Sequence, residues 1–386
     1  MQNVNVTKDK KVSVLITTFS RPEKLERAIS SVLKQTYKNI ELIIIDDAAT
    51  IDTVRIINNF LTKDSRIIHI RNEKNIGAKS GDIVHIRRFI YELATGEYFI
   101  YLCDDDYWLS NDFIENAVHL FRYRETTVAV IYGQLSIFLS KTKVGEYENG
   151  KSLFRITDET LKDFLEENYT SKHIAVSYMQ ALNSQPLFQN WAMTSDQYLN
   201  EFSKDPALRN IIVGGTLYNS LLFKKSKSLM QESGSKWQAG YELLISPSIY
   251  GDVIYIDKPM IITEIDIKNA SFRGTQLDHL NDCISGIIAA FSWALKDPSK
   301  KNRHKELKNY KAITIANICM TFLGNTSTIL RNIQLTDCSE DNTSKYLTPI
   351  KFIQIIFKHR ALFKITLSQW KIVMRVFKLY VLKNFI

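Results

Sequence analysis

Residues 11–47 read KVSVLITTFSRPEKLERAISSVLKQTYKNIELIIIDD and decide the fold. The first and last segments, KVSVLITTF and NIELIIIDD, are apolar runs rich in β-branched residues, which predict strands buried on both faces. The segment between them has apolar residues at helical spacing, Pro22 in the first turn, and Ser20 and Glu23 at the spacing of a capping box. It therefore predicts a helix between two strands of a parallel sheet.

The same alternation continues to residue 108. Residues 50–64 and 81–96 predict helices, the second ending at Gly96, while residues 66–72 and 97–108 predict strands. Four strands joined by three helices predict a doubly wound, mostly parallel α/β sheet. Since ligands bind outside the carboxyl ends of such strands, several polar residues are expected to converge on one site. They are Thr17, Thr18, Asp46, Asp47 and Asp104 to Asp106.

The rest of the 386-residue chain is less regular. Residues 111–265 are mixed, with strands predicted at 128–138 and 250–265 and a helix at 156–169. From Gln276 onward helical patterns dominate. We therefore expect three parts, at residues 1–110, 111–265 and 266–386, the last mainly helical and basic.

The positive charge of the chain comes from its C-terminal tail. Nine of the 50 Lys and Arg residues follow residue 341, where no Asp or Glu occurs, so the preceding residues carry equal numbers of both signs. On a helix, Trp370, Met374 and Phe377 share one stripe and Lys371 and Arg375 another. Such a tail is expected to lie on an anionic membrane surface, or else to pack on the core with a basic outer face. Nucleic acid is not an expected partner, since no recognition module accompanies the charge.

The sequence has no uncharged apolar stretch of about 18 residues and no apolar core with a cleavage site at its N-terminus. We therefore expect a cytoplasmic protein that is peripheral on the inner face of the cell membrane.

Asp104, Asp105 and Asp106 form the most informative polar cluster. Three adjacent carboxylates at the end of a buried strand repel one another unless a cation is present. Hard oxygen ligands of this kind suit Mn²⁺ or Mg²⁺, with a diphosphate completing the coordination shell. The alternative is a hydrated acidic turn that caps the helix beginning near Asn111. For Asp47, hydrogen bonding to a nucleobase or ribose and capping of the next helix are both open.

Together these segments resemble glycosyltransferase family 2, the inverting enzymes of the GT-A fold. The resemblance covers residues 11–121 and rests on the 11–47 segment, the Asn75-Ile76-Gly77 triplet and ATGEYFIYLCDDDYW, in that order. It implies a metal-dependent glycosyltransferase with a nucleotide-sugar donor. Residues 1–110 would then be the nucleotide-sugar half of the GT-A domain, 111–265 the acceptor half, and 266–386 the helical region with its tail.

The resemblance also implies roles for individual residues. Thr17 and Phe19 match the segment that contacts the nucleobase, with Phe19 replacing the usual Tyr, and Asp47 matches the Asp that binds base or ribose. Asp105 and Asp106 best match the metal and diphosphate carboxylates, with Asp104 beside them. The basic residue that approaches the diphosphate corresponds to either of two residues in a segment longer than usual. These are Lys79 and Arg87.

The acceptor half departs from the family pattern. Ala239 and Gly240 stand where an acidic pair with the catalytic base is expected, and the nearest carboxylate is Glu242. Glu242 is the expected base, with Glu232 and Asp196 behind it, and its alternative role is to stabilise a helix N-terminus. Gly214 and Gly215 either admit the donor sugar to the backbone or form a plain turn.

The resemblance implies a single displacement with inversion, in which a hydroxyl of a growing surface glycan takes the sugar. We expect the donor to be a UDP-sugar and the glycan to be lipid-linked. A sugar nucleotidyltransferase would carry a Gly-rich phosphate loop after the first strand, and TTFSRPEKL has no glycine. A catalytically inactive nucleotide-sugar-binding scaffold of GT-A fold remains the alternative.

Overall fold

The computed structural model describes residues 10–76, 81–140, 173–179, 190–204, 213–230, 239–265, 276–315 and 317–318. Contacts group the chain into two compact units. The first comprises Met1–Ala192, Ile212–Lys224 and Asp252–Ala270, and the second Met193–Ile211, Lys225–Gly251 and Ser271–Ile386. The division at residues 110 and 265 remains a prediction.

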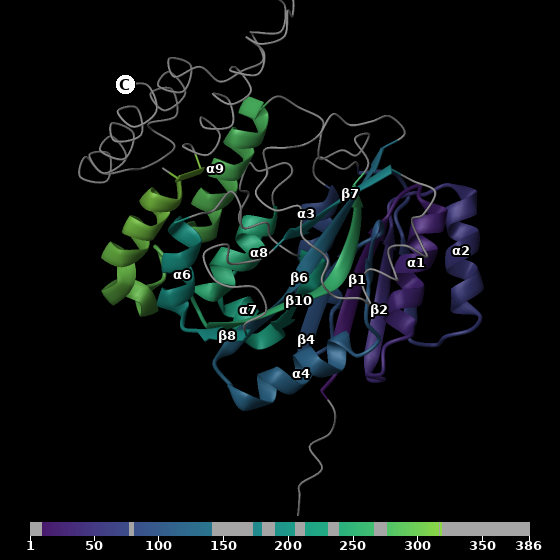
Figure 1. The fold of residues 1–386 in the computed structure, drawn as a ribbon, viewed down its shortest axis with the longest axis horizontal. Helices are drawn as coiled ribbons and strands as arrows, with labels where there is room; N and C mark the ends of the chain where they lie inside the picture. The colour runs from purple at the N-terminus through teal and green to yellow at the C-terminus, as the bar shows by residue number, and fades with distance from the viewer. Residues whose placement is uncertain are drawn as a thin grey trace, which may run out of the picture. The chain divides into compact units, whose positions relative to one another are not determined.

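The N-terminal half of the sheet has the predicted alternation. Its strands are β1 (Val12–Thr18), β2 (Ile40–Asp46), β3 (Ile67–Arg71) and β4 (Tyr98–Cys103), parallel in the order β3-β2-β1-β4. The intervening helices are α1 (Pro22–Leu33), α2 (Ile51–Leu61) and α3 (Gly81–Arg88), which continues into a π-helical turn at Phe89–Leu93. Helices α1 and α2 lie side by side next to β1 and β2 (Figure 1). The register pairs Thr18 with Asp46 and Thr17 with Cys103, so these strand ends are level.

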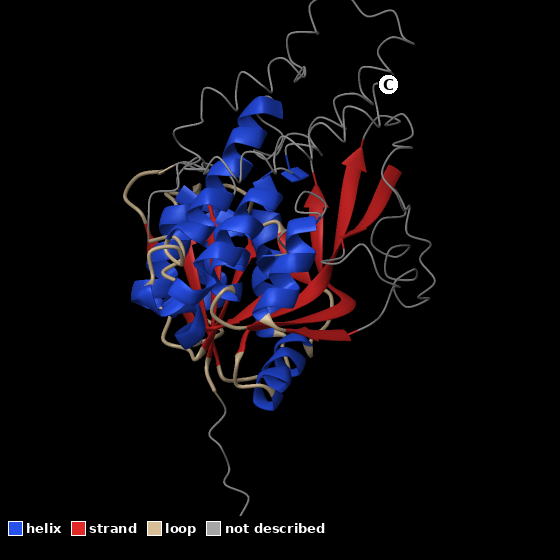
Figure 2. Ribbon diagram, turned by 90° about the vertical axis from the view of Figure 1, so that its left-hand side faces the viewer, coloured by secondary structure: helices blue, strands red, loops and turns tan. Residues whose placement is uncertain are grey.

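The sheet then continues with strands of mixed direction. Beyond β4 the order is β9 (Thr216–Asn219), β6 (Thr127–Ser140), β10 (Asp252–Ile265) and β5 (Asp106–Trp108). Strands β7 (His173–Met179) and β8 (Asn190–Met193) pair with β6 and β10, and α4 (Phe113–Tyr123) precedes β6. Figure 2 shows the strands twisted relative to one another, as strand sterics require. The predicted α/β class is confirmed.

Two predicted boundaries are wrong. The predicted capping box is absent, because Pro22 begins α1 and makes Arg21 the preceding residue, with no side-chain cap. Ser20 is one residue too early to cap a helix whose first position is a proline. The strand predicted over 97–108 ends at Cys103, and after a turn Asp106 begins β5, which pairs antiparallel with β10. The aspartate triplet therefore spans a turn between two strands.

Gly96 lies beyond the π-helical turn, which ends at Leu93, and its role is to let two backbone segments approach each other. A Cβ atom on Gly96 would lie 2.6 Å from the Lys11 carbonyl oxygen and 2.8 Å from the Ser13 nitrogen, so only glycine lets this backbone approach β1.

A buried carboxylate fixes the amino ends of the strands. Glu41 accepts the Thr95 N–H and hydroxyl, both at 2.8 Å, and also contacts Ser13 and Lys11. Burial opposes its ionisation, but these donors outweigh burial and lower the pKa of Glu41. This network holds the sheet at the end opposite to the carboxyl ends of β1, β2 and β4.

The described part of the second unit is mainly helical. It contains α6 (Ser195–Lys204), α8 (Ala239–Ser248), α9 (Gln276–Ser292), a 3₁₀ turn at Pro298–Arg303 and a helix over 304–315. Helix α7 (Ser220–Lys225) follows β9. None of the helices in the described ranges is both long enough and apolar enough to cross a bilayer. The predicted helix at 156–169 and the basic tail lie outside those ranges, so membrane binding by the tail stays a prediction.

Candidate functional site

The carboxyl ends of β1, β2 and β4 meet, as predicted. Thr18, the last residue of β1, connects them: its hydroxyl donates to Asp104 Oδ2 at 2.8 Å, and its carbonyl accepts the Asp47 N–H at 2.9 Å. Asp47 and the aspartate triplet thus lie on either side of Thr18, at one edge of the sheet.

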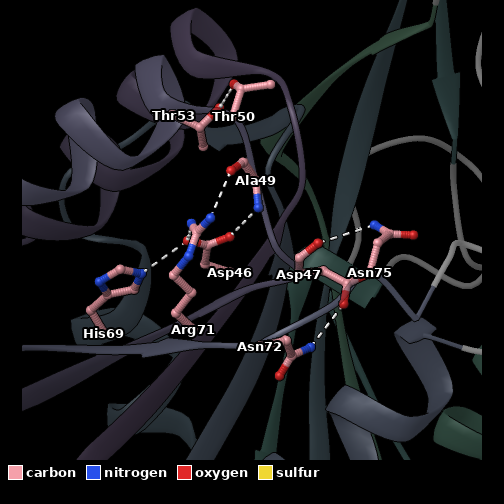
Figure 3. Close-up of polar contacts among 9 residues, drawn as sticks. All are labelled: Asp46, Asp47, Ala49, Thr50, Thr53, His69, Arg71, Asn72 and Asn75. Carbon is pink, nitrogen blue, oxygen red and sulfur yellow. Dashed lines mark hydrogen bonds and ion pairs between the residues drawn. The ribbon is translucent and has the colours of Figure 1, made fainter.

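The neighbouring carboxylates Asp46 and Asp47 have different environments (Figure 3). Asp46 is fully buried, accepts the Ala49 N–H at 2.6 Å and forms an ion pair with Arg71, while His69 Nε2 lies 3.3 Å away. Its bond to Ala49 spans Ala48, whose φ of 58° is unfavourable for a residue with a side chain. Asp46 therefore stabilises the turn from β2 into α2.

Asp47 is instead held by the segment that follows β3 (Figure 3). Its carboxylate accepts the Asn72 side-chain amide at 2.8 Å and the Ile76 N–H at 3.0 Å, and Asn75 donates to its carbonyl at 3.1 Å. His85 Nε2 of α3 lies 3.5 Å from Asp47 Oδ1. Burial lowers the pKa of His85, although the Asp47 charge opposes that shift. These contacts orient a nearly buried carboxylate, and no pattern in the sequence pointed to the part played by His85.

Asp104 and Asp105 share one cationic partner. Arg21 Nη1 lies 2.8 Å from Asp104 Oδ1 and 2.7 Å from Asp105 Oδ2. The Arg21 side chain is 39% exposed, whereas the two carboxylates are 8% and 14% exposed. A single guanidinium at the solvent boundary thus bridges two mostly buried carboxylates.

Asp106 is the buried member of the triplet. The Gln134 amide donates to the Thr263 hydroxyl at 2.7 Å, and Thr263 in turn hydrogen-bonds the Asp106 carboxyl group. Asp106 Oδ1 is buried and has no hydrogen-bond partner among the described residues. Burial raises the pKa of Asp106 well above its ordinary value, and the neighbouring Asp105 charge adds to the shift. A buried carboxylate oxygen without a hydrogen-bond donor costs free energy, and a bound cation would remove that cost.

Gly214 packs beside this carboxylate. A Cβ atom on Gly214 would overlap the Ile261 side chain and lie 3.5 Å from Asp106 Oδ2. The indole N–H of Trp108 donates to the Gly214 carbonyl at 2.8 Å. The glycine therefore permits a close approach of backbone to the site.

The other expected donor-site residues have varied positions. Thr17 is buried and its hydroxyl lies 3.0 Å from the Tyr101 hydroxyl, while Phe19 is half-exposed after β1. Arg87 lies in α3, and Lys79 lies outside the described residues. In the part of the chain that the structure describes, no three His, Cys, Asp or Glu side chains are arranged to hold a metal ion by themselves.

Glu242, the expected base, lies in the first turn of α8 in the second unit. It is 2% exposed, and its Oε2 accepts the Leu229 N–H at 3.2 Å. Its carbonyl accepts the Ser228 hydroxyl at 2.6 Å. Lys227 and Leu229 have φ values of 47° and 62°, so these bonds support a strained turn. Of the other two candidates, Asp196 pairs with Arg303 and Glu232 lies outside the described residues.

The segment that carries the aspartates of the site matches a known protein family. The model described as glycosyl transferase family 2 matches residues 13–183. This segment belongs to glycosyl transferase family 2. The family 2 segment includes β1 from its second residue, β2 to β4 and every aspartate of the site, so the expected family is confirmed for this segment, together with the GT-A type of fold.

Relatives of the family 2 segment include bacterial glucosyltransferases. It is similar to the Escherichia coli UDP-Glc:alpha-D-GlcNAc-diphosphoundecaprenol beta-1,3-glucosyltransferase WfaP, with 41% identity over 108 residues, 28% of this chain and 40% of the relative. A Campylobacter jejuni GalNAc(5)-diNAcBac-PP-undecaprenol beta-1,3-glucosyltransferase is 27% identical over 191 residues, 50% of this chain and 57% of the relative. The matches thus span less than two thirds of either relative.

A solved structure supports the fold. Staphylococcus aureus TarS 1–349 in complex with UDP-GlcNAc superposes with a TM-score of 0.53 at 13% identity, covering 84% of this chain and 77% of that one. At this identity the likeness concerns the fold alone.

Proposed function

We propose that the chain is an inverting glycosyltransferase that moves a sugar from a UDP-sugar to a hydroxyl of a lipid-linked surface glycan. The observation that carries the proposal is the buried Asp106 carboxylate beside Asp105, in a family 2 segment, at the strand ends that also carry Asp47. WfaP is named for a UDP-glucose donor, and both glucosyltransferase relatives are named for diphosphate-linked lipid glycan acceptors. UDP-glucose is therefore the first donor to test and a diphosphate-linked lipid glycan the first acceptor.

In this proposal each carboxylate has a separate task. Asp47, oriented by Asn72 and Ile76, accepts a hydrogen bond from the nucleobase or ribose, with Thr17 and Phe19 beside it. Asp105 and Asp106, with Asp104 next to them, hold Mn²⁺ or Mg²⁺ together with the diphosphate oxygens. When bound, the cation supplies positive charge that stabilises the departing nucleoside diphosphate. Arg87 or Lys79 approaches the same diphosphate.

The acceptor defines where the enzyme works. A lipid-linked glycan resides at a membrane, and a basic tail without acidic residues would be attracted to anionic lipid. We propose a peripheral enzyme at the inner face of the cell membrane, with the tail as its anchor.

The test is a transfer assay with UDP-glucose and a synthetic lipid-diphosphate GlcNAc acceptor, run with Mn²⁺ or with chelator. We expect a glycosylated lipid of inverted anomeric configuration that depends on the metal, and stabilisation of the protein by the donor. Stabilisation by UDP-sugars without turnover on any acceptor would favour the inactive scaffold. Neither stabilisation nor turnover with any UDP-sugar would contradict the proposal.

Glu242 is proposed as the general base, and its buried contacts make a specific test possible. Replacing Glu242 by Gln keeps the acceptor for the Leu229 N–H. If Glu242 is the base, transfer falls on the order of 10²–10⁴-fold, with donor affinity and melting temperature nearly unchanged. If it only supports the turn at Leu229, transfer by the Gln variant stays near wild type, while Glu242→Ala unfolds at a lower temperature.

A further inference from the structure

Arg21 forms ion pairs with two of the three aspartates of the triplet and has no role in the proposed reaction. It lies immediately before α1, directly after β1, and Nη1 is the nitrogen that contacts both Asp104 and Asp105. The two oxygens it contacts belong to adjacent residues of a turn, and each is within 2.8 Å of the same nitrogen. A divalent cation shared by these carboxylates would compete with Arg21 for them.

The charges in this cluster favour replacement of Arg21 by a divalent cation. Two largely buried carboxylates cannot both stay ionised without a neighbouring positive charge, and Arg21 supplies one charge for the pair. Asp106 is the third carboxyl group of the cluster; it is buried, and its Oδ1 has no partner among the described residues. A divalent ion would neutralise the cluster more completely than one guanidinium. The Arg21 side chain is 39% exposed, so water can solvate its guanidinium when a cation displaces it from the carboxylates.

We propose that Arg21 competes with the cation for the aspartate triplet. It neutralises Asp104 and Asp105 in the nucleotide-free enzyme and is displaced when the metal binds together with the donor diphosphate. The inference rests on the proposed metal site at the triplet. Its consequence is that the metal alone binds weakly, since it must displace an ion pair. With the nucleotide present, the diphosphate oxygens supply additional ligands that offset this loss. Metal and nucleotide therefore bind with positive coupling.

The test measures Mn²⁺ binding to the full chain without nucleotide, by the electron paramagnetic resonance signal of free Mn²⁺. Replacing Arg21 by Gln removes the competing charge, so we expect Mn²⁺ to bind about tenfold more tightly than to wild type. Replacing Arg21 by Lys keeps a charge but loses the planar guanidinium, and should give an affinity between the two. The matched control is Arg55→Gln, which removes an exposed Arg–Asp pair on α2 and should leave Mn²⁺ affinity unchanged.

A second measurement separates competition from mere structural support. We expect UDP to strengthen Mn²⁺ binding less in Arg21→Gln than in wild type, because part of the coupling comes from displacement of Arg21. An Arg21→Gln or Arg21→Lys protein that is folded but binds Mn²⁺ no more tightly than wild type would overturn the inference. If Asp105→Asn and Asp106→Asn also leave Mn²⁺ binding intact, the metal site itself is wrong, and the proposed function fails at that point independently of Arg21.

Discussion

Replacing Asp106 by Asn is expected to stabilise the metal-free protein and at the same time to abolish metal-dependent donor binding. Asp106 is buried, close to Asp105, and its Oδ1 lacks a partner among the described residues. Ionising such a group costs free energy that a neutral amide avoids, so we expect the free energy of unfolding to rise by about 1–3 kcal/mol at neutral pH. Transfer should fall on the order of 10²–10³-fold, since charge stabilisation in the transition state is lost.

The pH dependence of this effect has a defined sign. Because the pKa of Asp106 is raised in the folded protein, the wild type loses stability as pH rises from the ordinary carboxyl pKa of 3.8 toward the raised value. The advantage of Asp106→Asn should therefore vanish below about pH 4, where Asp106 is protonated in both states. Thermal unfolding across pH, with chelator, measures it. Asp52→Asn, an exposed carboxylate on α2, is the control; an Asp106→Asn protein that melts below wild type at pH 7 would contradict the account.

The adjacent residues Asp46 and Asp47 should separate stability from binding. Asp46→Asn removes the charge of a fully buried carboxylate that pairs with Arg71 and should cost about 2–3 kcal/mol of stability. The cost is not larger because the half-exposed Arg71 can return to water. Asp47→Asn should cost only about 1 kcal/mol, because a neutral oxygen still accepts the Asn72 and Ile76 donors. It should nevertheless weaken UDP binding about 10–100-fold, through loss of a charged acceptor.

Urea unfolding and calorimetric UDP titration of the same two proteins provide the comparison. The titration is performed at a temperature at which both variants are folded. Equal losses of UDP affinity in the two variants would show that Asp47 does not contact the nucleotide directly. A stability loss confined to Asp47→Asn would reverse the roles that the contacts assign.

Much of the fold was predictable because buried parallel strands leave a strong local pattern. β1 and β2 are buried at every position and rich in β-branched residues, and the helix between them is amphipathic, so their succession and burial follow from the local sequence pattern. The convergence of Thr18, Asp47 and Asp104 followed from the rule that parallel strands align their carboxyl ends. The start of α1 was predicted one residue too early. The capping pair indicated Ser20 as the N-cap, whereas Pro22 takes the first helical position and makes Arg21 the N-cap.

The finer organisation of the site depended on contacts between residues distant in sequence. Asp106 differs from Asp104 because β5 pairs with β10, which brings Thr263 to its carboxyl group, and no local pattern announces that pairing. His85 reaches Asp47 only because α3 packs near the end of β2. Arg21 left a weak signal, as a single basic residue after the first strand. Its contact with two carboxylates 83 or more residues away required the structure.

Asp47 and the aspartate triplet are proposed to serve one nucleotide and one cation. A crystal structure of the full chain with UDP and Mn²⁺, with the ion located by its anomalous scattering, tests this arrangement. We predict a Mn²⁺ peak about 2.0–2.2 Å from carboxylate oxygens of Asp105 or Asp106 and from the diphosphate, with the uridine beside Asp47. A Mn²⁺ ion bound elsewhere, or a uridine that does not reach Asp47, would contradict it.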